Sequence, residues 1–191
     1  MGLLVDMRPS DITPFEQLIL DTADFCDSLK LPFILDGSNL LGAVRDGRAI
    51  KWDKEVNFSV DIDDINEDIL TKCKEHKKFH QLNQSNIHPS AIYMFDNQNM
   101  WDSVPGVVLL SVFSRKNKKC YFNLCDDYCH VYPLEFGDKT KLEKLEFLGR
   151  DFNVPPNHKE MLRIYYGNDY MTPIEGWRWT QAGNLSTYAK I

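Results

Sequence analysis

The sequence predicts an α+β fold in which a mixed central sheet is flanked by helices. Three observations lead to this prediction. Apolar residues recur at helical spacing near both ends of the 191-residue chain, and several apolar runs with strand character follow one another in its middle. Residues 35–58 read as a strand, a short helix and a second strand. The length corresponds to about one domain, so we expect residues 1–191 to form a single domain.

The composition favours a folded protein that binds small ligands. Hydrophobic residues make up 43% of the chain and aromatic residues 12%, enough to build a core. The net charge of −6 argues against a general affinity for nucleic acid. The chain has no signal-peptide pattern and no apolar run of about 18 residues, so we expect no membrane span. Five cysteines without an export signal favour a reducing compartment, and the cytoplasm is the expected location.

The first third of the chain supplies the strand, helix and strand. Thr13-Pro14-Phe15-Glu16 has the form of a capping box, which predicts a helix over residues 14–30. A short strand at Phe33-Ile34-Leu35 is then ended by Asp36-Gly37-Ser38, which reads as a turn. We expect a helix over residues 39–45 and a strand over residues 56–60.

The remaining two thirds of the chain supply most of the sheet. Asp63 and Asp64 can cap a helix over residues 63–79, and Asp126-Asp127 suggests a tight hairpin. Asn157 and Glu160 form a second capping-box pattern, which predicts a helix that ends before Gly167. The tail from residue 176 is expected to pack loosely over the body. The expected strands cover residues 91–95, 107–113, 120–124, 128–134 and 142–147.

The strand after the short helix has a polar face. Side chains alternate along a strand, so Glu55, Asn57 and Asp61 share one face while Val56 and Phe58 point to the core. Two carboxylates at this spacing would lie about 6–7 Å apart and could share Mg²⁺ ions that bridge a nucleotide's phosphates. Here the second member of the pair is Asn57, a neutral ligand, and Asp61 is about 20 Å further along the strand. An ordinary solvent-facing strand explains the same pattern.

Gly37-Ser38 and Arg45 are candidate phosphate contacts. The Gly-Ser pair stands before a helix, where backbone N–H groups and a hydroxyl can receive phosphate oxygens, although a plain turn would also use it. Arg45 could offer its guanidinium to a phosphate or to Asp53. An exposed arginine at a helix C-terminus, favoured by the helix dipole, is an equally simple explanation.

A second candidate site lies among the cysteines. Three thiols and one imidazole fall within eleven residues and could form a zinc set. Their spacing is irregular and contains no C-x-x-C pair, so we do not expect structural zinc and read the thiols as buried core residues. The set is Cys120, Cys125, Cys129 and His130.

Three blocks of the sequence, taken together and in order, resemble the LicD family, which includes the fukutin group and is a branch of the nucleotidyltransferase fold. The first stands here as Gly37-Ser38-Asn39-Leu40-Leu41-Gly42-Ala43-Val44-Arg45, Gly47 and Ile50-Lys51-Trp52-Asp53-Lys54-Glu55-Val56-Asn57. The second is His130-Val131-Tyr132-Pro133-Leu134-Glu135, and the third is Val154-Pro155 followed by Tyr166-Gly167-Asn168-Asp169-Tyr170-Met171-Thr172-Pro173. The resemblance implies a nucleotidyltransferase-like fold with a recognisable core over about residues 33–173.

The resemblance also implies a function. Members of the family typically move a phosphorylated alcohol, of the phosphocholine or ribitol-phosphate type, from a CDP-linked donor to a glycan, teichoic acid or glycolipid acceptor with the help of a divalent metal. Carried over residue by residue, it makes Asp53 and Glu55 catalytic, with Gly37, Ser38 and Arg45 as phosphate contacts. The metal, Mg²⁺ or Mn²⁺, would be held by the residues Glu55, Asn57 and His130.

This chain departs from the family pattern toward less negative charge. Asn57 and His130 stand where the family has carboxylates, and Lys54 puts a positive charge where an acid is usual. Mg²⁺ prefers hard oxygen ligands, whereas Mn²⁺ tolerates an imidazole better. Asp36 or Glu135 could supply a replacement carboxylate. A second hypothesis is therefore a catalytically impaired relative that keeps the nucleotide cleft as a binding or regulatory module.

Overall fold

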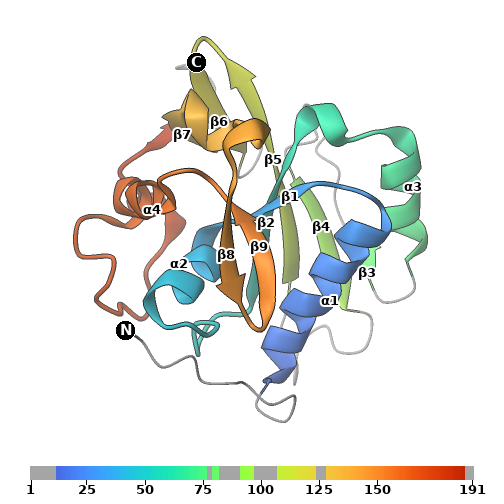
Figure 1. The fold of residues 1–191 in the computed structure, drawn as a ribbon, viewed down its shortest axis with the longest axis horizontal. Coiled ribbons are helices and arrows are strands. Elements are labelled where there is room, and N and C mark those ends of the chain that lie inside the picture. Colours follow the sequence, from blue (N-terminus) through green and yellow to red (C-terminus); the bar gives the residue numbers. More distant parts are fainter. Residues whose placement is uncertain (1–11, 77–78, 82–90, 97–106, 124–127, 188–191) are drawn as a thin grey trace.

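The computed structural model describes residues 12–76, 79–81, 91–96, 107–123 and 128–187 (Figure 1). Helices and a mixed sheet occur together within these ranges, and the predicted α+β fold class is confirmed. The helices are α1 (Pro14–Ser28), α2 (Gly37–Arg45), α3 (Glu67–Glu75) and α4 (His158–Tyr166). The strands are β1 (Phe33–Leu35), β2 (Glu55–Asp61), β3 (Phe79–Gln81), β4 (Ala91–Asp96), β5 (Val107–Lys116), β6 (Lys119–Asn123), β7 (Tyr128–Pro133), β8 (Glu143–Phe147), β9 (Arg150–Val154) and β10 (Leu185–Thr187).

One mixed sheet organises the molecule. Its main path runs β1-β2-β5-β6-β7-β10, and β4 pairs with β5 and β3 with β4. The long strand β5 runs parallel to β2, while its other edge pairs antiparallel with β4 along its first half and with β6 along its second half. β2 therefore lies inside the sheet, with β1 on one side and β5 on the other.

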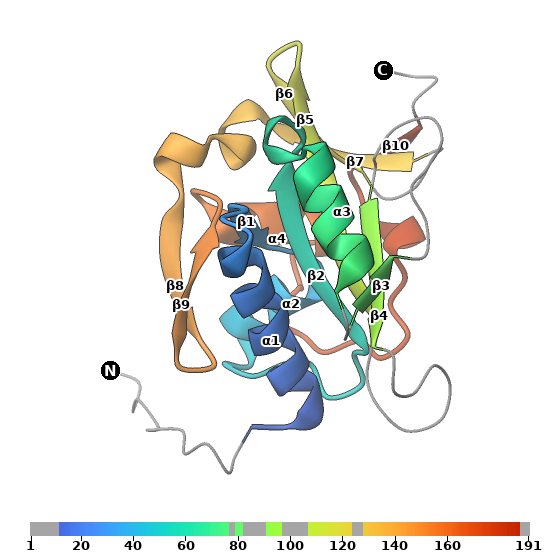
Figure 2. The same ribbon diagram turned by 90° about the vertical axis from the view of Figure 1, so that its right-hand side faces the viewer.

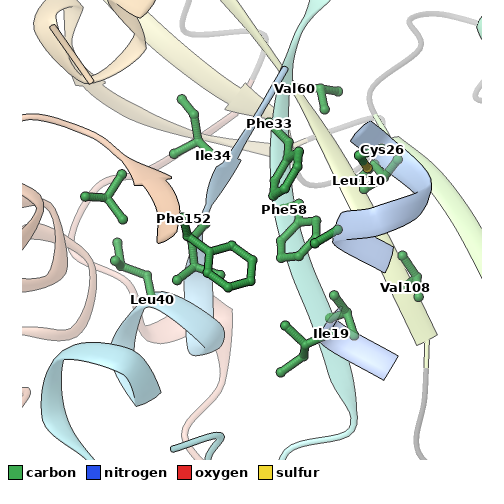
Figure 3. Close-up of a cluster of buried hydrophobic side chains, with 14 of the residues drawn as sticks. Ile19, Cys26, Phe33, Ile34, Leu40, Phe58, Val60, Val108, Leu110 and Phe152 are labelled. Atoms are coloured by element: carbon green, nitrogen blue, oxygen red, sulfur yellow. The ribbon is translucent and has the colours of Figure 1, made fainter. Parts of the chain in front are cut away.

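Helices cover both faces of this sheet. Two views show α1 and α3 on one face of β2, and α2 and α4 on the other (Figures 1 and 2). The β8–β9 hairpin forms a separate two-stranded sheet and packs beside β1. Figure 3 shows the rings of Phe33, Phe58 and Phe152 grouped in the core, with Phe33 stacked on Phe58 at 4.6 Å between centroids. The hairpin thus completes the hydrophobic core next to β2.

Local signals in the first third of the chain predicted the elements well. The capping box of α1 is formed, with Thr13 Oγ1 accepting the Glu16 N–H and Glu16 Oε2 accepting the Thr13 N–H. The helix ends at Ser28, two residues before the prediction. The short helix begins at Gly37 rather than at Asn39, because Asp36 is its N-cap and accepts the Gly37 N–H at 2.6 Å.

The next helix differs from the prediction. Residues 62–64 form a 3₁₀ turn, and α3 starts at Glu67 with Asn66 as its N-cap. Asp64 does not cap this helix, because its carboxylate accepts hydrogen bonds from Lys139 Nζ at 2.9 Å. Asp64, which the local pattern predicted as a helix cap, therefore pairs with Lys139, a residue distant in the sequence.

The C-terminal third shows the largest differences. The strand β9 and its pairing with β8 were not predicted. Asn157 precedes α4 as expected, but it has a left-handed backbone and its side chain makes no capping hydrogen bond. The tail does more than pack loosely, because β10 pairs antiparallel with β7 and joins the sheet. The predicted hairpin at Asp126-Asp127 lies outside the described residues.

Across the ranges that the structure describes, no helix is both long enough and apolar enough to span a membrane.

Candidate active site

The start of α2 is fixed directly against β2. Asn39 is fully buried, and its side chain accepts the Asn57 N–H at 2.7 Å and donates to the Glu55 carbonyl at 3.3 Å. Gly37 has a φ of +52°, and a Cβ there would lie 3.1 Å from Asn57 Cβ. A glycine is required at this point because the helix start and the strand approach so closely.

Asp53 lies at the turn that leads into β2. Its Oδ1 accepts the backbone N–H groups of Lys54 at 2.8 Å and Glu55 at 3.2 Å. The other oxygen, Oδ2, is buried and receives no hydrogen bond of normal geometry from the described residues. Burial raises the pKa of Asp53, although the Ser38 hydroxyl and the two N–H groups oppose this effect. An unpartnered buried carboxylate oxygen is costly, which makes Asp53 Oδ2 a candidate contact for a ligand.

Glu55 adds a second carboxylate to the first. Burial, together with the charge of Asp53, raises the pKa of Glu55 to about 7, and the Asn57 side chain lowers it only in part. Among the described residues, no lysine or arginine forms an ion pair with either carboxylate. Two neighbouring buried carboxylates, one of which raises the proton affinity of the other, would suit a divalent cation that neutralises both.

Asn57 is tied into the same group. Its Nδ2 donates to Ser38 Oγ at 3.0 Å and to the Glu55 carbonyl at 3.1 Å. The amide oxygen is then the atom left to act as a neutral metal ligand. The chemistry of these side chains would suit a divalent cation, with charged oxygens from Asp53 and Glu55 and a neutral one from Asn57.

A cavity of about 440 Å³ opens beside Asp53. Ser38 and Arg45 line it on one side, while Glu55 and Asn57 are not among its lining residues. The side chain of Arg45 is only 6% exposed and forms a two-pronged pair with Asp46, at 2.9 and 2.7 Å, rather than with Asp53. The opposite wall comes from α4 and the segment after it. The aromatic and acidic residues of this wall are Tyr166, Tyr170, Trp177, Asp169 and Glu175, and Trp52 joins them from the segment before β2.

His130 lies apart from this group. In the sheet it stands in one cross-strand row with Phe122, Phe113 and Asp61, at the end of β2 away from Glu55. Its Nδ1 contacts Asn184 Oδ1 at 3.1 Å, and its ring packs edge-on against Tyr165 at 4.3 Å. Burial lowers the pKa of His130 to about 4, and the structure does not bring it to Glu55 and Asn57.

The other candidate ligands are also committed elsewhere. Asp36 accepts the Gly37 N–H and the Ser59 hydroxyl, at 2.6 and 2.5 Å. Cys120 and Cys129 are buried free thiols, whereas Cys125 lies outside the described residues. Within the described part of the chain, no three His, Cys, Asp or Glu side chains are grouped to hold a metal ion. A cation at Asp53 and Glu55 would therefore rely on Asn57, water or phosphate oxygens for its remaining ligands.

Sequence reasoning assigned no role to the aromatic wall. Trp52 and Tyr166–Tyr170 stand inside the blocks that carried the family resemblance, which was the available signal. Trp177 packs on Tyr165 and Tyr166 at 5.1 and 4.5 Å between ring centroids. Its place in the wall depends on the path of the tail, which no local pattern predicts.

Comparison with known proteins agrees with this arrangement. The model of the family described as LicD/FKTN/FKRP, nucleotidyltransferase domain, matches residues 30–157. No curated protein matches the chain. The matched range contains both α2 and β2, the elements that build the candidate site, and it covers more than half of the chain. The chain therefore belongs to the LicD/FKTN/FKRP family, a membership that suggests a phosphotransferase-like activity.

Proposed function

We propose that this chain is a metal-dependent transferase that moves a phosphorylated alcohol from a CDP-linked donor to a glycan, teichoic acid or glycolipid acceptor. The observation that carries the proposal is the pair Asp53 and Glu55, with one buried carboxylate oxygen that has no partner and a shared excess of negative charge. Asp53 also lines the cavity where a substrate would bind. Four buried free thiols in the described ranges favour a reducing compartment, and we keep the cytoplasm as the expected location.

Each residue of the site has a task in this reaction. Asp53, Glu55 and the Asn57 amide oxygen would hold Mg²⁺ or Mn²⁺, which supplies positive charge to the transferring phosphoryl group. The Ser38 hydroxyl lies at the first turn of α2, where phosphate oxygens are favoured. Arg45 lines the same cavity, and its guanidinium would leave Asp46 to bind the donor's diphosphate. Because phosphoryl transfer needs mainly positioning and charge stabilisation, these groups suffice.

The cavity favours a cationic alcohol of the phosphocholine type over a ribitol type. The rings of Trp52, Tyr166, Tyr170 and Trp177 line it together with the carboxylates of Asp169 and Glu175. Aromatic faces attract a quaternary ammonium group, and nearby carboxylates strengthen this attraction. A polyol would need several hydrogen-bonding groups in place of the rings.

Release of CMP from CDP-choline and from CDP-ribitol, in the presence of Mn²⁺ and with a sugar hydroxyl or water to accept the phosphorylated alcohol, tests the proposal. Asp53→Asn should lower the CMP release by about 100-fold, because it removes charge next to the transferring phosphate. Asp151→Asn, an exposed carboxylate on β9, is the matched control and should leave the rate unchanged. CMP release that does not depend on metal, or equal rates for the two variants, would refute the assignment.

One observation favours the second candidate, a binding or regulatory module without catalysis. Asn57 stands where the family has an acid, and its Nδ2 is used by Ser38 and the Glu55 carbonyl, which closes the site internally. A module of this kind should bind CDP equally well with Mn²⁺ and with EDTA, and should release no CMP from either donor.

A further inference from the structure

The loop between α2 and β2 forms one wall of the cavity. Residues 46–54 carry Trp52 and Asp53, which line it, and Ile50, which lines it from a buried position. The Asp53 N–H donates to the Ile50 carbonyl at 3.0 Å, so the position of Asp53 depends on that of Ile50. Contacts that fix the first half of the loop therefore also fix the position of Asp53 in the cavity wall.

Glu16, on the first turn of α1, holds the first half of the loop. Its two carboxylate oxygens accept hydrogen bonds from Arg48 Nε and Nη2, each at 2.6 Å, and Oε1 also accepts the Ala49 N–H at 3.2 Å. The same side chain accepts the Thr13 N–H at 2.9 Å as part of the capping box. Glu16 is 1% exposed. Burial alone would raise the pKa of Glu16, but these hydrogen bonds outweigh it and lower the value to about 2.

A glycine seats the same loop on α2. A Cβ at Gly42 would lie 2.7 Å from the Arg48 carbonyl oxygen and 3.3 Å from the Ile50 nitrogen. The backbone at Arg48 and Ile50 thus touches α2 on one side, while Glu16 binds Arg48 and Ala49 from α1. The loop is fixed between two helices at the residues directly before Trp52 and Asp53.

We propose that Glu16 is a positioning residue, which holds the loop of residues 46–54 so that Trp52 and Asp53 keep their places in the cavity wall. The effect of Glu16 on metal binding rests on the proposed transferase function. The hydrogen-bond partners of Glu16 among the described residues are Thr13, Arg48 and Ala49, none of which lines the cavity, so it would act on the wall through the loop. If Glu16 served only to cap α1, its hydrogen bond with the Thr13 N–H would be enough. Most of the hydrogen bonds of Glu16 go instead to Arg48 and Ala49 in the loop.

The chain offers a matched control on the same helix. Arg150 of β9 pairs with Asp24 and Asp27 of α1 at 2.8 and 2.5 Å, and these two carboxylates are 76% and 61% exposed. Arg150→Met therefore removes ion pairs from α1 without touching the loop. Arg48→Met removes the charged contact of the loop but leaves the capping box of α1 in place, so it tests the loop even if Glu16→Gln folds poorly.

Amide hydrogen exchange of the loop is the direct readout, and it needs no activity. In Glu16→Gln and Arg48→Met, amides of residues 49–55 should exchange about tenfold faster than in the unchanged protein, while Arg150→Met should not change them. Arg48→Lys, which keeps a charged donor, should restore part of the protection. Loop exchange that is unchanged in both variants, or raised equally by Arg150→Met, would overturn the proposal.

Mn²⁺ titration then separates this proposal from the proposed function. The Mn²⁺ affinity should fall about tenfold in Glu16→Gln and Arg48→Met, since a displaced Asp53 no longer faces the ion with Glu55. If the unchanged protein binds Mn²⁺ and both variants bind it equally well, the positioning role is wrong. If the unchanged protein binds no Mn²⁺, the proposed function fails, and the exchange rates alone decide the role of Glu16.

Discussion

The two ends of β2 carry carboxylates on the same face in very different surroundings. Asp61, at the far end, is 1% exposed and lies 2.5 Å from Arg115 Nη2 and 3.4 Å from Lys139 Nζ. Glu55, at the near end, has another carboxylate, Asp53, as its charged neighbour. One end of the strand is neutralised by the protein itself, and the other is not.

This difference separates a structural carboxylate, Asp61, from the proposed functional one, Glu55. A buried charge is costly unless it is paired, and the protein meets that requirement at Asp61 with two cations. At Glu55 the imbalance remains as a pKa near 7 and as the unpartnered Oδ2 of Asp53. Perturbed titration next to a cavity is typical of functional sites, and it supports the cation and phosphate site proposed above.

The largest effect is expected at the structural end. Asp61→Asn should lower the free energy of unfolding by about 3 kcal/mol, because it leaves Arg115 and Lys139 without their buried partner. Urea unfolding measures the loss. Asp63→Asn is the matched control, since Asp63 also contacts Arg115, at 3.1 Å, but is 72% exposed. The loss of unfolding free energy in Asp63→Asn should stay below about 1 kcal/mol. Equal losses in the two variants would contradict the distinction between buried and exposed pairs.

At the functional end, removal of charge should stabilise the fold. In EDTA at pH 8, Glu55→Gln should raise the free energy of unfolding by about 1–2 kcal/mol, after allowance for the part of the side chain that reaches solvent. Urea unfolding at fixed pH gives the value. A loss of stability at pH 8 would mean that Glu55 has a favourable partner in the folded protein, and the near end of β2 would then carry no uncompensated charge.

The same carboxylate sets a pH dependence with a defined sign. The pKa of Glu55 rises from an ordinary 4.5 to about 7 on folding, so the folded state binds the proton more tightly. Its contribution to stability is full below about pH 4.5 and is lost as the pH rises through 7. Glu55→Gln should remove this decline between pH 4.5 and 7, while an unchanged decline would assign it to another group.

Restoring an acid at position 57 sharpens the same point. Asn57→Asp loses the donor Nδ2 that binds Ser38 Oγ and the Glu55 carbonyl, and it adds a third negative charge. Stability without metal should fall by about 1 kcal/mol, whereas Mn²⁺ affinity should rise about tenfold. Urea unfolding and Mn²⁺ titration measure the two effects. An affinity that does not change would show that position 57 is not a metal ligand.

The smallest effect is expected in the aromatic wall. Trp177→Leu should weaken binding of CDP-choline about three- to fivefold and leave binding of CDP unchanged, because only the choline group would meet the ring. Equilibrium titration with both ligands provides the comparison. Equal weakening of the two would mean that Trp177 supports the cavity rather than the cation.

Local patterns were enough to predict the scaffold of the site. The capping box of α1, the alternation along β2 and the close Gly37-Ser38 pair are encoded within a few residues, and the structure has α1 and β2 close to where these patterns place them. The residues Ser38, Asp53, Glu55 and Asn57, predicted as phosphate, catalytic and metal residues, come together because α2 and β2 are nearly consecutive in the chain. Their roles stay predictions.

The features that local patterns could not predict depend on pairing between segments that are distant in the sequence. His130 was assigned from a block that begins 75 residues after Glu55, and only the register across β5, β6 and β7 shows that its row ends at Asp61. The strand β10 and the place of Trp177 likewise depend on where the tail meets β7 and α4. No periodicity within a segment contains that information, because it is set by contacts between segments.

Mn²⁺ titration calorimetry in the presence of CDP tests the central claim most directly, with Glu55→Gln and Asp61→Asn compared at a temperature where both variants are folded. If the near end of β2 is a metal site, the unchanged protein binds Mn²⁺, Glu55→Gln weakens binding about tenfold or more, and Asp61→Asn leaves the affinity unchanged. Absence of Mn²⁺ binding, or equal weakening by the two variants, would contradict the claim.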